Sequence, residues 1–404
     1  MRMKAGLYVP ILLSVCLFIV PFGCQPAQSS PSAATNMPRN VILLIGDGMG
    51  FEQVKAAGLY AHGRTGKLAF ERLPVKGRMT THCANRPITD SAAAGTAMAA
   101  GVKVNKGVVS VRIPGNGERL ETVLEIAQRA GKRTGLVTTT QMCHATPAVF
   151  GAHVKSRSQF SDIAGHYLRD SRPNVLLGGK APGGKGMTLD AARSAGYRTA
   201  STRAELGAAV KDGADRICGL FGDDHMPYEY EYMIRLDTGY DRMPHLSEMT
   251  AAALEVLERG DNGFFLMVES GRIDHACHKN LIRQCVYETL EFASTVRRVM
   301  EWADGRDDTL IVVTADHECG GLKVTGGADS GGFPAVKWSS DGHTAARVPI
   351  YAWGVGAEAV KQVSDNTDIY WLLLGESPAK AGAAEAAAQS NEAEPAGAGG
   401  SAGY

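Results

Sequence analysis

Three uninterrupted apolar runs constrain the fold of this chain more than any other feature of its sequence. They begin at residues 40, 263 and 309, and each leads directly to an acidic residue: Asp47, Glu269 or Asp316. Apolar strands without polar alternation are typical of a parallel sheet that helices bury on both faces. The sequence therefore predicts an α/β fold with a largely parallel central sheet flanked by helices.

Weaker patterns extend this prediction to the rest of the chain. The 404 residues, 44% of them apolar, suffice for one large α/β domain or two ordinary ones. The 42 Lys and Arg residues balance the 42 Asp and Glu residues, which argues against a nucleic-acid-binding surface. Further strands are expected over 134–140, 174–178 and 348–353, and helices from residue 51 and over 121–130, 204–212 and 246–259.

The N-terminus has the pattern of an export signal. A short basic stretch precedes an apolar run over 7–22, and the run ends at Gly23-Cys24. A small residue before a cysteine resembles a bacterial lipoprotein signal, so a lipidated Cys24 would attach the protein to a membrane. Pro21 stands where such signals usually carry Leu, which leaves a plain secretory signal open. Either signal predicts an exported protein of the periplasm or cell envelope.

The chain is accordingly expected to contain four segments. They are a signal peptide over 1–23, a flexible tether over 24–39, a folded domain over 40–375 and a disordered tail over 376–404. The tether and the tail are rich in small residues and Pro, and neither has a hydrophobic period that could build a core.

The cysteines of the folded domain could form disulfides in an exported protein. Cys277 and Cys285 are close enough in sequence to close a short loop. The pairing stays open, because it cannot be deduced from the sequence. The full set is Cys83, Cys143, Cys218, Cys277, Cys285 and Cys319.

A stretch of small residues over 89–101 places Ser91 where a loop should become a helix that stops at Gly101. The free N–H groups and the positive dipole end of a helix start would stabilise an alkoxide or a phosphate at Ser91. The plainer interpretation is that Ser91 or Asp90 is an ordinary helix cap, because both residue types are common there.

Acids and histidines elsewhere in the chain favour the functional interpretation. The carboxyl ends of parallel strands meet at one edge, so the acids that end the three runs would cluster there. Asp316 is followed by His317, and one helical turn would put Asp274 and His278 on the same face. Each pair alone could be a surface ion pair, but together with His343 they suit zinc and magnesium. The sequence therefore predicts a metal centre at this edge.

With these residues in place, the chain resembles the zinc- and magnesium-dependent alkaline phosphatases from about residue 40 to residue 375. The resemblance implies a three-layer sandwich, a hydrolase for small phosphate monoesters and, as is common in the family, a homodimer. The motifs that carry it are Gly-Asp47-Gly-Met-Gly, Thr-Asp90-Ser91-Ala-Ala, Ala-Thr146-Pro-Ala with Arg157 downstream, Val-Glu269 with Asp274 and His278, Thr-Ala-Asp316-His317, and Gly-His343-Thr.

The resemblance also implies a role for each motif residue. Ser91 would be the nucleophile that forms a phosphoserine, and Arg157 would clamp two phosphate oxygens. Two Zn²⁺ and one Mg²⁺ would be bound per chain. The first zinc would be held by Asp274, His278 and His343, the second by Asp316, His317 and Asp47 beside Ser91, and the magnesium by Asp47, Thr146 and Glu269.

Two positions depart from the best-known enterobacterial pattern of the family. His144 stands where those enzymes carry Asp, and His275 stands where they carry Lys. Both are expected near the bound substrate. The surroundings of the magnesium are therefore expected to differ from those in the enterobacterial enzymes.

Two other functions remain open. A phosphodiesterase or sulfatase could share the scaffold, but Ser91 lacks the Pro and Arg of the sulfatase motif, and diesterases usually lack the ligands Thr146 and Glu269. A non-catalytic metal- or phosphate-binding lipoprotein belongs to a different class. Turnover of a phosphate monoester distinguishes these possibilities.

Overall fold

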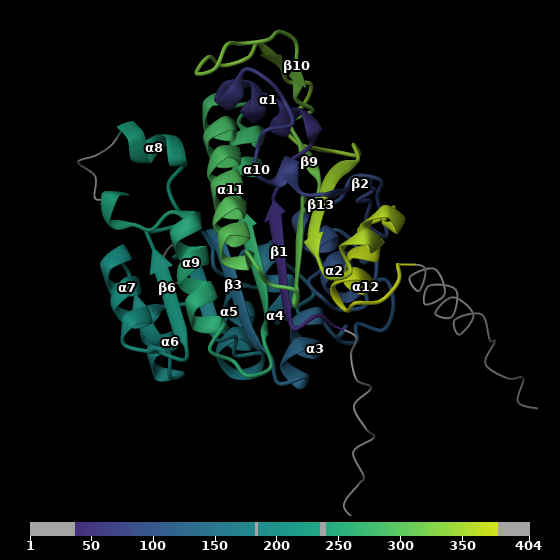
Figure 1. Cartoon of the computed structure of the whole chain (residues 1–404). Coiled ribbons are helices and arrows are strands. Elements are labelled where there is room, and N and C mark those ends of the chain that lie inside the picture. The colour runs from purple at the N-terminus through teal and green to yellow at the C-terminus, as the bar shows by residue number, and fades with distance from the viewer. Residues whose placement is uncertain (1–36, 182–184, 235–239, 379–404) are drawn as a thin grey trace, which may run out of the picture. The chain divides into compact units, whose positions relative to one another are not determined.

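The computed structural model of the chain describes residues 37–181, 185–234 and 240–378 (Figure 1). The predicted signal peptide, Cys24, residues 24–36 of the predicted tether and residues 379–404 of the predicted tail lie outside the described residues. Within the described ranges, a nine-stranded sheet runs in the order β2 (Val75–Met79), β13 (Val348–Gly354), β8 (Thr309–Thr314), β1 (Asn40–Gly46), β7 (Phe264–Ser270), β3 (Arg133–Gln141), β4 (Val175–Gly179), β6 (Ile217–Phe221) and β5 (Arg198–Ala200).

The three apolar runs form the centre of this sheet. β1 lies between β7 and β8 and is parallel to both, and every residue of the three strands is buried. Ile45 is aligned with Glu269 on one side and with Thr314 on the other. This register brings the acids that follow or end the three strands to one edge. The prediction of a largely parallel sheet is confirmed, and β13 is the strand that runs antiparallel to its neighbours.

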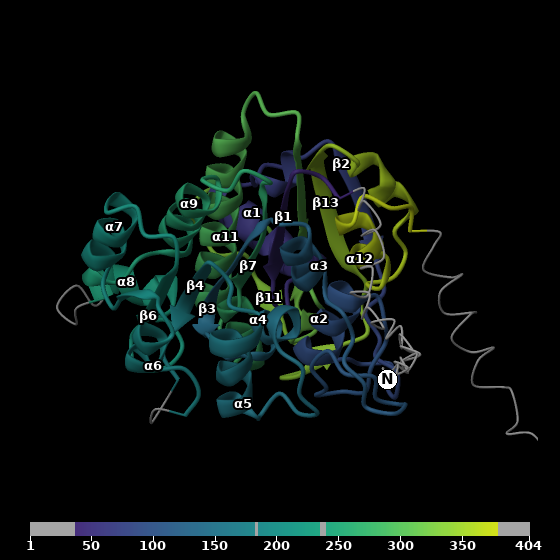
Figure 2. The same cartoon turned by 90° about the horizontal axis from the view of Figure 1, so that it is seen from below.

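Helices cover both faces of the sheet (Figure 2). α9 (Leu246–Leu257) and α11 (Ile282–Ala303) lie on one face, and α2 (Ser91–Ala100) and α4 (Ala145–Gly151) lie on the other. The other helices are α1 (Phe51–His62), α3 (Val123–Arg129), α5 (Phe160–Gly165), α6 (Leu189–Ser194), α7 (Arg203–Lys211), α8 (Glu229–Ile234), α10 (Arg272–His278) and α12 (Asp368–Leu373), with short helical turns η1 (Phe70–Arg72), η2 (His166–Asp170), η4 (Tyr240–Arg242) and η5 (Ala357–Gln362).

Two short ladders complete the fold beside the carboxyl edge of the sheet. β10 (Lys323–Val324) pairs with β11 (Val336–Lys337), and β9 (Glu318–Cys319) pairs with β12 (His343–Thr344). The second ladder matters for the site, because it aligns Cys319 with His343.

α11 corrects the predicted set of elements. It spans 22 residues, but no helix is predicted between His278 and Thr309. Its buried face includes Val286, Phe292 and Val296, which recur at roughly helical spacing along the sequence. No helix in the described part of the chain is long and apolar enough to cross a membrane.

The structure shows no disulfide among the six cysteines of the folded domain, whose pairing the sequence left open. Within the described residues they are all buried and none is in a disulfide. The sulfurs of Cys277 and Cys285 lie 3.6 Å apart, which is a contact and not a bond.

Candidate metal centre and active site

Ser91 occupies the first turn of α2, as the sequence predicts. Asp90 caps this helix, because its Oδ1 accepts a hydrogen bond from the N–H of Ala93 at 3.1 Å. Gly101 ends the helix with a φ of 69°, a conformation that favours glycine. The small residues of α2 allow a close approach to α4: a Cβ on Gly95 would lie 2.8 Å from Val149 Cγ2.

The Ser91 hydroxyl lies among an inner group of side chains at the carboxyl edge of the sheet. Its Oγ is 3.4 Å from Asp47 Oδ2 and 3.3 Å from His317 Nε2. The same ring nitrogen is 3.4 Å from Asp47 Oδ1 and 3.2 Å from Asp316 Oδ2. All of these residues are buried. The ends of β1 and β8 and the start of α2 therefore bring one predicted ligand set together with the nucleophile candidate.

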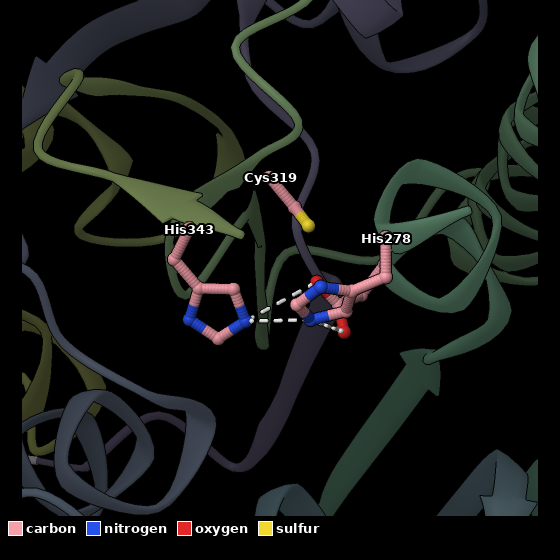
Figure 3. A group of neighbouring side chains, drawn as sticks. His278, Cys319 and His343 are labelled. Carbon is pink, nitrogen blue, oxygen red and sulfur yellow. Dashed lines mark hydrogen bonds and ion pairs between the residues drawn. The ribbon is translucent and has the colours of Figure 1, made fainter. Parts of the chain in front are cut away.

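A second, outer group comes from α10 and the β9–β12 ladder (Figure 3). His278 Nε2 and His343 Nε2 lie 3.0 Å apart, and each is within 3.5 Å of an oxygen of Asp274. Both histidines bond a backbone carbonyl through Nδ1, which leaves Nε2 directed at the shared point. Cys319, which was not predicted as a site residue, contributes its sulfur to the same group.

A third group surrounds Glu269. One ligand atom each from Asp47, His144 and Glu269 lies within 4.8 Å of the other two. Thr138, also absent from the predicted site, donates a hydrogen bond of 2.5 Å to Glu269 Oε2 and fixes that carboxylate. Thr146 lies in the first turn of α4 beside this group and is fully buried.

Several of the candidate metal-ligand atoms in these groups have no hydrogen-bond partner in the protein. Among the described residues, the buried atoms without a hydrogen-bond partner include Asp47 Oδ1, Thr146 Oγ1, Glu269 Oε1, Asp274 Oδ1 and Asp316 Oδ2. Buried polar atoms are rarely left without a partner, because each costs roughly 1–3 kcal/mol. Carboxylate oxygens, imidazoles and a hydroxyl that converge in this way fit divalent metal ions.

The ionisation of the acids supports the same fit. Burial and the neighbouring carboxylates raise the pKa of Asp47 well above its ordinary value. Burial also raises the pKa of Glu269 to about 7 and that of Asp316 to about 6. Asp274 differs: burial opposes its ionisation, yet the hydrogen bond with His278 and the nearby histidines hold its pKa below the usual range. A bound cation would keep all of these groups ionised.

The pKa values of the histidine ligand candidates differ from one another in direction. Burial lowers the pKa of His317 and of His343 to about 4, so both rings are neutral at neutral pH and can offer a lone pair. The hydrogen bond to Asp274 raises the pKa of His278 to about 9, so a metal ion must displace a proton from this ring.

Arg157 faces the same cavity as Ser91. Its Nη1 donates to Asp90 Oδ2 at 2.9 Å, and its Nη2 donates to His144 Nε2 at 3.0 Å. A guanidinium held on one side can present its remaining N–H groups to a phosphate. The cavity measures about 910 Å³ and is lined by Arg86, Pro87, Ile88, Asp90, Ser91, Lys106, His144, Arg157, Asp274, His275, His278, Gly342 and His343.

His225 joins the two histidines that depart from the enterobacterial pattern. Its ring lies 4.4 Å from the ring of His275 and 5.6 Å from that of His144, measured between centroids. Arg272 donates to His275 Nδ1 at 2.9 Å. His225 was not a predicted site residue, because the loop after β6 carries no metal-ligand spacing that would signal it.

A parallel sheet that gathers carboxylates, imidazoles and a helix-borne serine at one edge defines a metal-dependent α/β enzyme. The comparison with known proteins identifies which one. The alkaline phosphatase family model matches residues 38–334, and the chain belongs to that family. The protein is therefore a phosphatase that acts on phosphate monoesters and depends on divalent metal ions.

Individual relatives agree with this assignment. The chain is 33% identical to alkaline phosphatase 3 of Bacillus subtilis, over 91% of this chain and 78% of that protein. It is 30% identical to the alkaline phosphatase of Escherichia coli, over 87% of this chain and 88% of that protein. The solved structure of Thermus thermophilus alkaline phosphatase superposes with a TM-score of 0.74 at 26% identity, covering 87% of this chain and 96% of that one.

Proposed function

We propose that this phosphatase transfers the phosphoryl group of a monoester to Ser91 and then hydrolyses the resulting phosphoserine. The observation that carries the proposal is the surroundings of the Ser91 hydroxyl. It lies 3.4 Å from a carboxylate oxygen of Asp47 and 3.3 Å from His317 Nε2, at the N-terminal turn of α2. A serine in that position can lose its proton and attack, because the positive helix end favours an alkoxide.

The site would hold two Zn²⁺ and one Mg²⁺. The three ligand groups described above support this number, since each contains a buried ligand atom that lacks a hydrogen-bond partner. Bound ions would neutralise the charge that develops on the attacking and leaving oxygens and would lower the pKa of water. We assign Asp274, His278 and His343 to the outer zinc, Asp47, Asp316, His317 and Ser91 to the inner zinc, and Asp47, Thr146 and Glu269 to the magnesium.

The protein itself would orient the phosphate. Arg157 would bind two of its oxygens with the edge that Asp90 and His144 leave open. The N–H groups at the start of α2 would add donors on the side of Ser91. These contacts would hold the phosphorus beside the nucleophile and so reduce the entropic cost of the reaction.

His144 makes the third site the one most sensitive to the type of ion. Mg²⁺ prefers oxygen ligands, and an imidazole is a poor substitute. A similar enzyme, TAB5 alkaline phosphatase, superposes with a TM-score of 0.70 at 25% identity, and a structure of its histidine-to-aspartate variant has Mg bound in the M3 site. By the same chemistry, His144 of this chain would weaken magnesium binding. His144 and His275 both line the cavity of Ser91, so both would lie beside the bound substrate.

We also propose that the folded domain spans residues 40–375 of an exported protein, with a signal peptide over 1–23, a tether over 24–39 and a tail over 376–404. Support comes from the sequence pattern around Gly23-Cys24. Replacing Cys24 by Ser should release the enzyme from membranes if Cys24 is lipidated and should leave its distribution unchanged if the signal is a plain secretory one.

Turnover with three nitrophenyl substrates tests the reaction. We expect the phosphate monoester to be cleaved much faster than the diester or the sulfate, and a chelator to abolish this activity. Ser91→Ala should lower kcat by about 10³-fold or more, because it removes the nucleophile. Ser270→Ala is the matched control: Ser270 is another buried serine, at the end of β7. Preference for the diester or the sulfate would disprove the proposal.

A trapping experiment tests the intermediate. Acid quenching of the enzyme during turnover should leave one phosphate on the peptide that contains Ser91, as measured by mass spectrometry. The same peptide from the Ser270→Ala enzyme should carry the phosphate as well. Turnover without any phosphorylated Ser91 peptide would indicate direct attack by water.

A further inference from the structure

Cys319 belongs to the outer group of ligand candidates, although none of the motifs quoted above includes it. Its sulfur and one donor atom each of Asp274, His278 and His343 lie within 4.8 Å of one another. The side chain is fully buried. Figure 3 shows the sulfur pointing toward His278, with His343 on the other side of the group.

The β9–β12 ladder fixes the direction of this sulfur. Cys319 is directly aligned with His343 in the antiparallel pair, and opposed residues of such a pair project from the same face. The Cys319 N–H donates to the carbonyl of Gly48 at 3.1 Å, and its own carbonyl accepts from Gln53 Nε2 at 2.8 Å. The ladder therefore presents Cys319 and His343 together to the helix that carries Asp274 and His278.

A second cysteine close by lacks this arrangement. Cys277 precedes His278 on α10, and its sulfur is 3.6 Å from that of Cys285 and 3.9 Å from Gln53 Nε2. It is absent from the outer group of ligand atoms, among the described residues. Cys277 is thus a buried cysteine of the same neighbourhood that can serve as a control.

We infer that Cys319 is a fourth protein ligand of the outer metal ion, beside Asp274, His278 and His343. This inference rests on the proposed metal centre and adds one ligand to it. A set of two imidazoles, one carboxylate and one thiolate suits Zn²⁺, which accepts sulfur and nitrogen in tetrahedral geometry. A thiolate also disfavours Mg²⁺ and Mn²⁺, so the outer site selects a thiophilic ion.

The chemistry of this ligation balances without a redox partner. The thiol loses one proton to solvent as the sulfur–metal bond forms. With Asp274, His278, His343 and Cys319 as its protein ligands, the bound ion would still be able to accept an oxygen of the substrate, because catalytic zinc sites can expand their coordination. The competing role for Cys319 is a neutral thiol that donates a hydrogen bond to Asp274, in which case it only positions that ligand.

Cobalt spectroscopy of the purified full-length enzyme separates the two roles. Co²⁺ replaces Zn²⁺ in such sites, and a thiolate ligand adds a sulfur-to-cobalt charge-transfer band in the near ultraviolet. We expect the wild-type protein to show this band together with the visible bands of bound cobalt. Cys319→Ser should keep the visible bands and lose the charge-transfer band, while Cys277→Ser should keep both.

Zinc affinity, measured by competition with a chromophoric chelator, gives a second readout. Cys319→Ser should bind the outer zinc at least about 10-fold more weakly, and Cys277→Ser should bind it like the wild type. A charge-transfer band that survives in Cys319→Ser, or that is missing from a wild-type protein with visible cobalt bands, overturns the inference alone. If no cobalt bands form at all, the proposed metal centre fails with it.

Discussion

Arg157 Nη1 donates to Asp90 Oδ2 at 2.9 Å, and the other oxygen of this carboxylate, Oδ1, accepts hydrogen bonds from the N–H groups of Ala93 and Gly107. Asp90 therefore links the predicted phosphate clamp to the helix of the nucleophile. Burial opposes its ionisation, but the charge and hydrogen bonds of Arg157 hold the pKa of Asp90 below its ordinary value. A single ionised side chain sets the position of two functional groups.

Asp90→Ala should therefore affect phosphate binding and stability together. Loss of the helix cap should lower the free energy of unfolding by about 1 kcal/mol. Release of Arg157 should weaken inhibition by inorganic phosphate by about 10-fold. Thr202→Ala removes the cap of α7, where Thr202 Oγ1 accepts from Glu205 N–H, and serves as the control. Equal phosphate inhibition in the two variants would show that Asp90 does not position Arg157.

Gly48 is tied to the outer metal site by a close contact. Its φ is 72°, and a Cβ at this position would lie 2.8 Å from Asp274 Oδ1. Gly48→Ala should displace Asp274 and weaken zinc binding by about 10-fold or more, in addition to a backbone cost of about 1 kcal/mol. Gly66→Ala carries only the backbone cost, because Gly66 has a φ of 77° and no atom within 4 Å of the added Cβ. Chelator competition should show tighter zinc binding in Gly66→Ala.

The part of the site that could be predicted from the sequence depends on local signals. β1, β7 and β8 are buried on both faces, so their apolar runs are uninterrupted and the residue at which each strand ends can be predicted from the sequence. Asp47 and Asp316 follow two of these strand ends. Once the strands are taken to be parallel neighbours, their register alone predicts that the two side chains lie close together. The position of Ser91 at the start of a helix could also be predicted, because the close packing of α2 on α4 requires the small residues that mark this helix in the sequence.

The remaining features depend on contacts between distant segments. Cys319 reaches the site through the β9–β12 ladder, and His225 reaches it through the loop after β6. The sequence around each residue contains no pattern that predicts these contacts. The antiparallel direction of β13 is likewise set by its neighbours and not by its own pattern. α11 is different, since its buried face recurs with helical spacing and could have been predicted.

His144→Asp should convert the third site into a better magnesium site. His144 Nδ1 is buried without a hydrogen-bond partner among the described residues, and a carboxylate there would add an oxygen ligand beside Asp47 and Glu269. Magnesium titration of zinc-loaded enzyme, followed by calorimetry and by activity, should show about 10-fold tighter binding. His225→Asp is the control, because His225 lies outside the third ligand group. Equal tightening in both variants would contradict the assignment.

Glu125 offers a pH-dependent test of stability away from the metal centre. It is the third residue of α3 and completes the cap formed by Thr122. Its Oε1 contacts His153 Nε2 at 3.0 Å, and the other nitrogen of that ring contacts the Ser110 carbonyl at 2.8 Å. Burial opposes the charge of Glu125, but these hydrogen bonds outweigh it and lower the pKa of Glu125 from 4.5 to about 2.

A lowered folded-state pKa means that the stabilisation by Glu125 is complete above pH 4.5 and is lost as the pH falls through about 2. Glu125→Gln keeps an acceptor for the helix cap and removes the charge. Its deficit in unfolding free energy should be on the order of 2 kcal/mol at neutral pH and should shrink by about 1 kcal/mol at pH 4. Urea denaturation at the two pH values measures this difference. Glu205→Gln, at the equivalent position of α7, should show a much smaller change, because Glu205 is exposed. A deficit of Glu125→Gln that stays constant from pH 7 to pH 4 would mean that the charge of Glu125 does not stabilise the fold.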